Sequence, residues 1–240
     1  MTEEPYRWLE AIGNRREYVR EQLKGGSPAF VAKLDDGILL LGVGSGQSKV
    51  FELFDRHALA ALGHPADIEK IRQAAIDAAH TEAFTRAPED VSLRRLIGFG
   101  LSPQLKTNFE QIFSAPFLIE MLVAEIGATP ESDFIVRLHF DGAFQISTTQ
   151  VTVAAAEPER EKAAQDWLNR SLNGSQDRKV VVERLLEAWW RLIEGKEFSE
   201  EVPSDWRKAL EDKVVEIGWL DRGTTRQARY SALTLAEVGL

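Results

Sequence analysis

The chain has 240 residues, of which 44% are hydrophobic and 28% are charged, and its net charge is −9. The supply of apolar residues excludes intrinsic disorder, and no apolar run reaches the roughly eighteen residues that a membrane-spanning helix requires. The absence of cysteine excludes disulfides, a thiolate nucleophile and cysteine-bound zinc, and the negative charge argues against nucleic acid or an anionic membrane as the main partner.

The N-terminal segment is predicted to form a helix ahead of a set of strands. Its first residues, Met1-Thr2-Glu3-Glu4, lack the charged-then-apolar order of a signal peptide, so we expect a cytoplasmic protein. Apolar side chains recur at helical spacing as far as Leu23, and Gly25-Gly26 is typical of a helix end. Four strands then follow, and we expect them to form one antiparallel meander: 28–34, 38–43, 49–54 and 58–62.

Helical spacing replaces strand alternation at Pro65, where a proline is tolerated in the first turn of a helix. A second helix is predicted to begin at Pro88 and to continue to about residue 112. Because Gly98, Gly100 and Pro103 fall inside it, we expect a kink or a break there.

The remainder of the chain again gives strands first and helices after them. We predict strands at 117–126, 134–140 and 144–152, helices at 159–172 and 179–193, a polar connection at 195–204, and strands at 213–220 and 226–235. No internal repeat or long linker divides the chain, so we expect one domain over residues 1–240. The segregated blocks predict an α+β fold in which two antiparallel sheets pack together with helices on the outer faces.

Two patterns that could mark a ligand site have simpler interpretations. The run Gly42-Val43-Gly44-Ser45-Gly46 resembles a phosphate-binding loop, but such loops lead into a helix whose amides bind the anion. Here a strand follows, which favours a tight hairpin. The four histidines lack the three- or four-residue helical spacing of metal ligands, so we expect neither a metal nor a cofactor.

Catalysis by an N-terminal nucleophile is a possible alternative. Such a hydrolase uses a serine or threonine freed at the head of a strand, with its own amine as the base. Ser27 heads the first predicted strand, and removal of Met1 would expose Thr2. The unbroken helical pattern before Ser27, and the lack of an acid at the end of the second strand around Val43, argue against this reading.

A collinear set of motifs resembles proteasome α-type subunits, most clearly from about residue 15 to 148. The helix-to-strand junction from Glu17 to Ser27 is similar to the family's Glu-Tyr-Ala-Arg-Glu…Gly-Ser junction. Further matching motifs follow in the family's order: Asp36-Gly37-Ile38-Leu39-Leu40, Ser48-Lys49-Val50-Phe51-Glu52-Leu53, Ala60-Ala61-Leu62-Gly63-His64-Pro65, Pro116-Phe117 and Phe140-Asp141-Gly142.

The resemblance implies the four-layer αββα sandwich of the Ntn-hydrolase and proteasome-subunit fold. It implies a non-catalytic subunit in a seven-membered ring, with residues 1–26 as a gating segment and helix, and with peptidase activity in partner β-type subunits. It further implies that a ring-shaped ATPase or another activator docks its C-terminal tail, with Lys49 pairing with the terminal carboxylate and with Arg20 and Gly63 forming the pocket. A solvated lysine at a strand end is the alternative reading of Lys49.

Departures from the family pattern leave other readings open. The stretch Pro5-Tyr6-Arg7-Trp8 replaces the Tyr-Asp-Arg gate motif, which favours a bacterial or divergent type. Ala154-Ala155-Ala156 replaces a glycine-containing turn, and the glycines and proline within the second predicted helix are unusual, so the β-type partner could be atypical. The alternatives are a self-processing hydrolase that uses Ser27 or Thr2, and a stand-alone ring without a β partner.

Overall fold

The computed structural model describes residues 4–198 and 205–240, and two five-stranded antiparallel sheets organise it. One sheet has the order β10-β9-β2-β1-β8, with bounds Tyr230–Leu233, Val214–Asp221, Gly37–Gly44, Ala29–Leu34 and Val151–Ala154. The other has the order β3-β4-β5-β6-β7, with bounds Val50–Phe54, His57–Gly63, Ile119–Glu125, Phe134–His139 and Phe144–Ile146. The predicted α+β class with two antiparallel sheets is confirmed.

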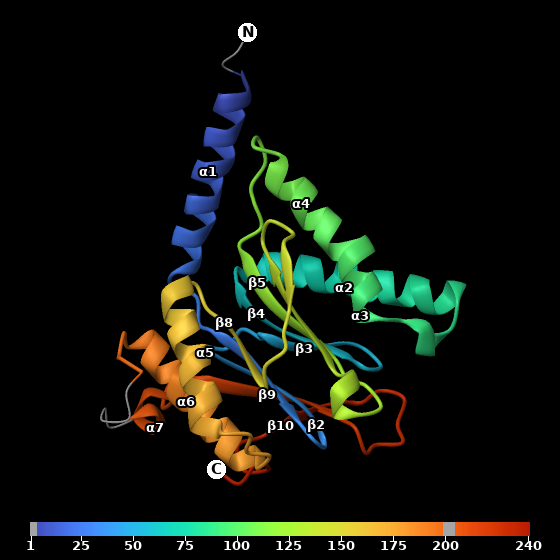
Figure 1. The fold of residues 1–240 in the computed structure, drawn as a ribbon, viewed down its shortest axis with the longest axis vertical. Helices are drawn as coiled ribbons and strands as arrows, with labels where there is room; N and C mark the ends of the chain where they lie inside the picture. Colours follow the sequence, from blue (N-terminus) through green and yellow to red (C-terminus); the bar gives the residue numbers. More distant parts are fainter. Residues whose placement is uncertain (1–3, 199–204) are drawn as a thin grey trace.

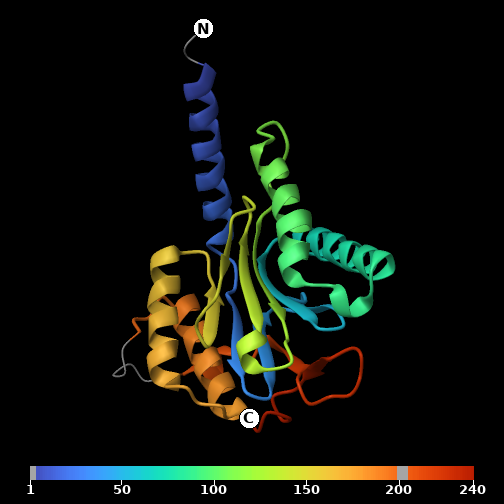
Figure 2. The ribbon, with the colours of Figure 1, turned by 45° about the vertical axis from the view of Figure 1, so that its right-hand side comes forward.

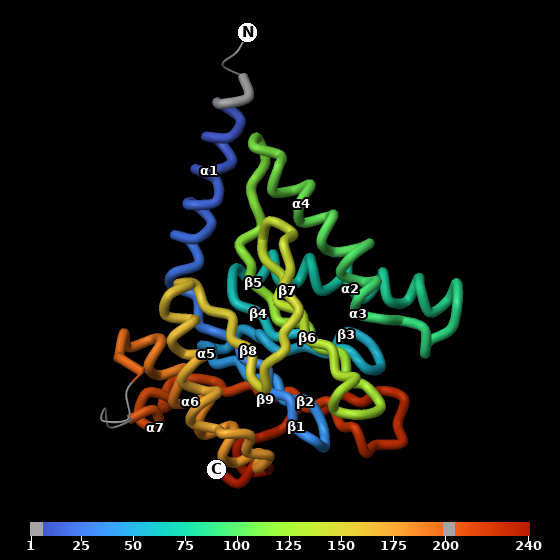
Figure 3. Tube along the Cα trace, viewed as in Figure 1, coloured from blue at the N-terminus to red at the C-terminus, as the bar shows by residue number. Residues whose placement is uncertain are grey.

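Two strand predictions were wrong in how they joined the sheets. The first four strands do not form one meander, because the β1–β2 hairpin belongs to one sheet and the β3–β4 hairpin to the other. The glycine-rich run at 42–46 therefore connects two sheets and does not close a hairpin, although a strand follows it as predicted. Likewise, the strand expected at 144–152 is two strands, β7 and β8, which lie in different sheets (Figure 3).

The helices α2 (Pro65–Thr85) and α4 (Ser102–Glu110) pack with the β3–β7 sheet in a core that also includes side chains from β1 and β2. No break separates α4 from the short helix α3 (Leu93–Arg95), because a π-helical segment, η2 (Leu96–Leu101), joins them. The expected irregularity is therefore a widened helical turn. The proline at 103 lies at the junction of η2 and α4, where the π-helical turn already interrupts the regular α-helical hydrogen-bond pattern.

The second helix begins later than predicted, at Leu93, because a side chain from the sheet caps it there. Pro88–Asp90 forms only a single 3-10 turn, η1. The Glu125 carboxylate accepts the Leu93 N–H at 2.7 Å and also faces Arg56 at 3.1 Å and His57 at 3.5 Å. Burial would by itself raise the pKa of Glu125, but His57, the Leu93 amide and Arg56 outweigh it and hold that pKa below its usual value.

The helices α5 (Pro158–Leu172) and α6 (Arg178–Ile193) cover the other sheet. Their tryptophans, including Trp167 and Trp189, are buried with side chains of β1, β2 and β9 in a second core. The sequence reading missed α7 (Trp206–Ala209), a four-residue helix, and the predicted polar connection at 195–204 lies partly outside the described residues. A short 3-10 turn, η3 (Pro130–Ser132), lies between β5 and β6.

Helix α1 (Glu4–Leu23) rises from the body beside the tip of α4 (Figures 1 and 2). Its C-terminal part is anchored by the buried side chains of Val19 and Leu23, and the helix ends as predicted before Gly25. Farther out, the Arg15 guanidinium donates to the carbonyl oxygens of Ser114 at 2.6 Å and Asn108 at 3.1 Å. These contacts fix the direction in which α1 leaves the body.

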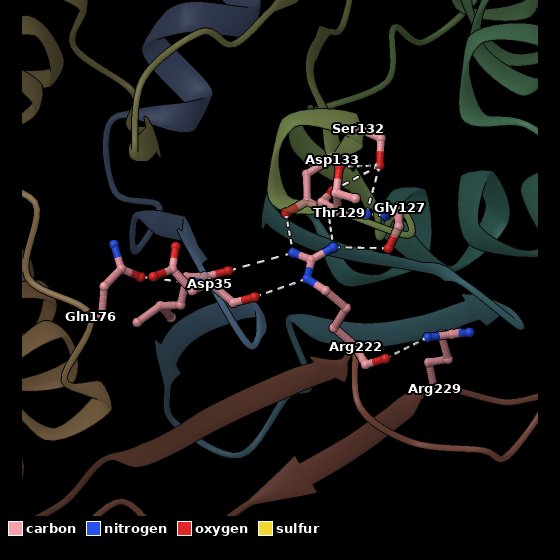
Figure 4. A network of polar contacts seen from close by, with 9 residues as sticks. Asp35, Gly127, Thr129, Ser132, Asp133, Gln176, Arg222 and Arg229 are labelled. Atoms are coloured by element: carbon pink, nitrogen blue, oxygen red, sulfur yellow. Dashed lines mark hydrogen bonds and ion pairs between the residues drawn. The ribbon is translucent and has the colours of Figure 1, made fainter.

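Arg222 ties the two sheets together at the loop between β9 and β10 (Figure 4). Its guanidinium donates to both carboxylate oxygens of Asp133, at 2.9 and 2.7 Å, and to the carbonyl oxygens of Gly127 at 2.8 Å and Asp35 at 3.0 Å. The Asp133 side chain is completely buried. One residue therefore joins the β5–β6 loop of one sheet to the β1–β2 turn of the other.

Candidate functional site

A cavity of about 590 Å³ lies where the end of α1, the loop after β2 and helix α6 meet. The residues that line it are Gly25, Gly26, Ser27, Val43, Gly44, Ser45, Gln47, Lys49, Gly63, Trp189, Ile193 and Lys213. Two of the predicted pocket residues, Lys49 and Gly63, are brought together here. Although the chain carries a net charge of −9, none of these lining residues is acidic. We refer to this space as the Lys49 cavity.

Lys49 is partly buried, and its side chain is held along the backbone of β2. A Cβ atom on Gly44 would lie 3.3 Å from the Cε atom of Lys49, and a Cβ on Gly42 would lie 3.1 Å from its Cβ. Because these two glycines have no side chains, there is space along β2 for the aliphatic part of Lys49. This close packing distinguishes Lys49 from a freely solvated lysine at a strand end.

The nearest carboxylate, that of Glu216 on β9, is engaged by the backbone. It accepts the amide N–H groups of Lys49 at 2.9 Å and Val50 at 3.0 Å. Within the part of the chain that the structure describes, no carboxylate lies within ion-pair distance of the Lys49 ammonium. Burial lowers the pKa of Lys49, and the charge of Glu216 opposes this shift. The site thus holds a desolvated cation that a bound carboxylate would stabilise.

Gly63 is required by the backbone at the end of β4. Its φ is +136°, and a Cβ there would lie 2.0 Å from the carbonyl oxygen of Leu118. An L side chain can occupy neither that conformation nor that space. Gly63 therefore shapes the wall of the cavity and contributes no side-chain chemistry.

Arg20 lies in a different place. It is exposed on α1 and lines a neighbouring cavity of about 410 Å³. That cavity is also lined by Glu120, Asp141 and Glu161, so its cations already have acidic neighbours, whereas no acidic residue lines the Lys49 cavity. Within this chain the structure does not bring Arg20 to Lys49, and its part in a shared pocket stays a prediction.

The structure also adds residues to the cavity that the sequence reading did not place there. The Oγ atom of Ser27, the alternative nucleophile, accepts a hydrogen bond from the indole Nε1 of Trp189 at 2.9 Å. Thr2 lies outside the described residues. Lys213 reaches the cavity through the pairing of β9 with β2, and its Nζ lies 3.2 Å from the Oγ of Ser45. Because that pairing joins segments about 170 residues apart, no local signal in the sequence could have found it.

The described residues contain no cluster of three or more His, Asp or Glu side chains arranged to hold a metal ion. Among the described helices, none has both the length and the apolar character needed to cross a bilayer. The cavity is therefore best characterised by its cations and backbone groups. Its arrangement can bind an anion.

The fold and the cavity define an α+β protein with paired antiparallel sheets and, at a helix-to-strand junction, a cavity that is lined by two lysines and no acidic residue. The chain is 31% identical over 199 residues to the proteasome subunit alpha of Streptomyces avermitilis, covering 73% of this chain and 76% of that protein. It is 31% identical over 195 residues to the proteasome subunit alpha of Streptomyces scabiei, covering 73% and 78%. The protein of the same name from Pseudarthrobacter chlorophenolicus is 29% identical over 218 residues, covering 89% and 85%. No family model matches the chain. The chain belongs to the proteasome α-subunit family.

Proposed function

We propose that this chain is a non-catalytic α-type subunit that forms a seven-membered ring on a proteasome core particle in the cytoplasm. Residues 1–26 gate the entry of substrates to β-type peptidase subunits, and the Lys49 cavity receives the C-terminal tail of a ring-shaped ATPase activator. Residues 1–240 form one domain with the four-layer αββα arrangement. The observation that carries this proposal is the acid-free cavity around the partly buried, unpaired ammonium of Lys49 among the described residues.

The chemistry of the cavity suits a chain terminus. A terminal carboxylate is present on every polypeptide, so an ammonium in a partly desolvated site recognises it whatever sequence precedes it. The lysine stem is held against Gly42 and Gly44, which reduces the conformational entropy that binding would cost. Arg20 is exposed on α1, where we expect it to complete the pocket of an adjacent subunit.

The surroundings of Ser27 support a non-catalytic role. An N-terminal nucleophile needs a free amine, whereas Ser27 is joined to α1 through the turn at residues 24–26, in which the Gly26 N–H donates to the Leu23 carbonyl at 2.7 Å. The indole N–H bound to the Ser27 Oγ cannot accept a proton. Val43, near which a catalytic relative would carry an aspartate, is buried at 1% exposure.

The exposed apolar side chains of α1 support its burial against neighbouring subunits in a ring. Trp8, Leu9 and Tyr18 are 44%, 59% and 51% exposed, although a projecting helix gains little from apolar residues that face water. A second apolar surface supports contact with a β-type ring: Phe84 at the end of α2 is 91% exposed and Phe99 in η2 is 82% exposed. The helices α5 and α6 on one sheet, and α2 and α4 on the other, support the four-layer arrangement.

The docking role is tested with Lys49→Met in the particle assembled with its β-type subunits and activator. We expect activator-stimulated protein degradation to be lost, because the terminal carboxylate loses its cation, while cleavage of small peptides by the particle stays unchanged. Lys179→Met, at an exposed lysine at the start of α6, is the matched control and should behave as the wild type. Unaltered activator dependence in Lys49→Met would refute the assigned role.

Two measurements separate the alternatives. Intact-mass analysis of the purified chain detects self-processing, and a stable product that begins at Ser27 would favour the hydrolase. Native mass spectrometry with co-expressed β-type subunits detects the mixed particle. A seven-membered ring that never joins a β-type ring would instead favour a stand-alone assembly.

A further inference from the structure

The Lys49 cavity contains a second cation, Lys213, whose position the fold determines closely. Strand β9 pairs antiparallel with β2 up to Gly44 and Val214, so Lys213 comes directly beyond the last pair, beside the loop that follows β2. Its backbone N–H donates to the carbonyl of Leu210 at 2.9 Å. The Lys213 side chain is thus anchored at its base and reaches the same space as Lys49.

The Lys213 ammonium is bound only to a neutral group. Its Nζ lies 3.2 Å from the Oγ of Ser45, and within the described residues it forms no ion pair. Lys213 is exposed, whereas Lys49 is partly buried, so Lys213 lies toward the solvent side of the cavity and Lys49 lies deeper. Two like charges that line one cavity repel each other, and a ligand with two negative charges would reduce this repulsion.

A single chain terminus supplies only one carboxylate. If that group pairs with the deeper Lys49, as the proposed function requires, the outer ammonium of Lys213 still has no anion. On a chain with net charge −9, this local excess of positive charge also attracts an acidic segment as it approaches. A second negative group a short distance before the end of the partner's tail would supply that anion.

We infer that Lys213 binds an acidic side chain of the docking tail, so that the cavity selects protein C-termini with a glutamate or aspartate shortly before the terminal carboxylate. This inference rests on the proposed docking at Lys49 and adds the chemistry of the partner. Lys49 recognises the chain end, and Lys213 determines which chain ends bind best.

The test uses fluorescence anisotropy with the assembled full-length protein and ten-residue peptides. One series carries glutamate at the second, third or fourth position from the C-terminus, and a matched series carries glutamine there; each peptide is made as a free acid and as an amide. For the wild type we expect the best glutamate peptide to bind about fivefold more tightly than its glutamine match, the factor of a partly exposed ion pair. The difference should shrink as salt is raised.

The variants separate the role of Lys213 from that of Lys49. In Lys213→Met the glutamate preference should vanish while the preference for a free acid over an amide remains. In Lys49→Met the free-acid preference should vanish, and Lys179→Met should match the wild type. If Lys213→Met weakens glutamate and glutamine peptides equally, or leaves the glutamate preference intact, the role of Lys213 is overturned. If the wild type itself does not distinguish acid from amide, the docking function at Lys49 fails instead.

Discussion

Replacing Arg222 with methionine removes the guanidinium that joins the two sheets while it keeps an unbranched side chain in the same place. Five hydrogen bonds disappear, two of them to Asp133 and one each to the carbonyls of Leu34, Asp35 and Gly127. Asp133 is fully buried and retains only the Gly127 N–H, at 2.9 Å, among the partners described. The substitution therefore leaves a buried carboxylate without its counter-charge.

Breaking a buried ion pair from one side costs about 3–5 kcal/mol, because the remaining charge is desolvated and uncompensated. Typical domains have free energies of unfolding of about 5–15 kcal/mol, so Arg222→Met should remove a large part of the free energy of unfolding of this protein. Equilibrium unfolding in urea, at one fixed protein concentration, measures the loss. Adding Asp133→Asn to Arg222→Met should recover part of it, since the amide carries no charge and can still accept the Gly127 N–H.

An exposed ion pair provides the control for this prediction. Arg207 faces Glu183 at 3.1 Å with the arginine side chain 68% exposed, and Glu183→Gln should change the free energy of unfolding by no more than about 1 kcal/mol. Two results would show that the Arg222–Asp133 ion pair does not hold the two sheets together. One is that Arg222→Met lowers the free energy of unfolding as little as Glu183→Gln, and the other is that the double variant is no more stable than Arg222→Met alone.

Three further substitutions test the backbone and the electrostatics. Gly63→Ala should destabilise the fold by about 2 kcal/mol or more, since its Cβ would meet the Leu118 carbonyl at 2.0 Å and the residue would be strained at a φ of +136°. Gly13→Ala lies within α1, and no atom lies within 4 Å of the new Cβ, so this substitution should instead stabilise the fold by up to about 1 kcal/mol. If the urea midpoints of Gly63→Ala and Gly13→Ala shifted in the same direction, this reasoning would be contradicted. Glu125→Gln should lower the melting temperature near neutral pH, because the lowered pKa of Glu125 means that its carboxylate stabilises the fold above the unfolded pKa of about 4.3. That difference from the wild type should shrink as the pH falls below about 4, and a difference that persists at low pH would exclude ionisation as its source.

Most of the secondary structure could be predicted from local pattern. The apolar spacing up to Leu23 predicted α1 and its end, and apolar runs between turn signals predicted β1 to β6 to within a few residues. These features are local because a helix or strand records in its own residues which face is buried. The start of the helix at Leu93 could not be predicted, since the group that caps it is Glu125, on a strand 32 residues away in sequence.

The sequence pattern could not predict which of the two sheets each strand joins. Strands β2 and β3 are adjacent in sequence, and so are β7 and β8, yet each pair is divided between the two sheets. Every residue of β2 is buried, so the strand has no polar face from which its neighbours could be inferred. Hydrogen-bond pairing over long sequence distances decides this arrangement, and a one-dimensional period cannot encode it.

The sequence by itself determined the α+β class, the family to which the chain belongs and the candidacy of Lys49 as a carboxylate-binding lysine, because these depend on short motifs and their order. Only the tertiary structure decided what surrounds that lysine. It placed Gly63 and Ser27 beside Lys49, put Arg20 in a separate cavity, and brought Lys213 across from the end of the chain through the pairing of β9 with β2. The physical reason is that a cavity's charge is the sum of all the groups that fold around it, and those groups come from segments that share no local pattern.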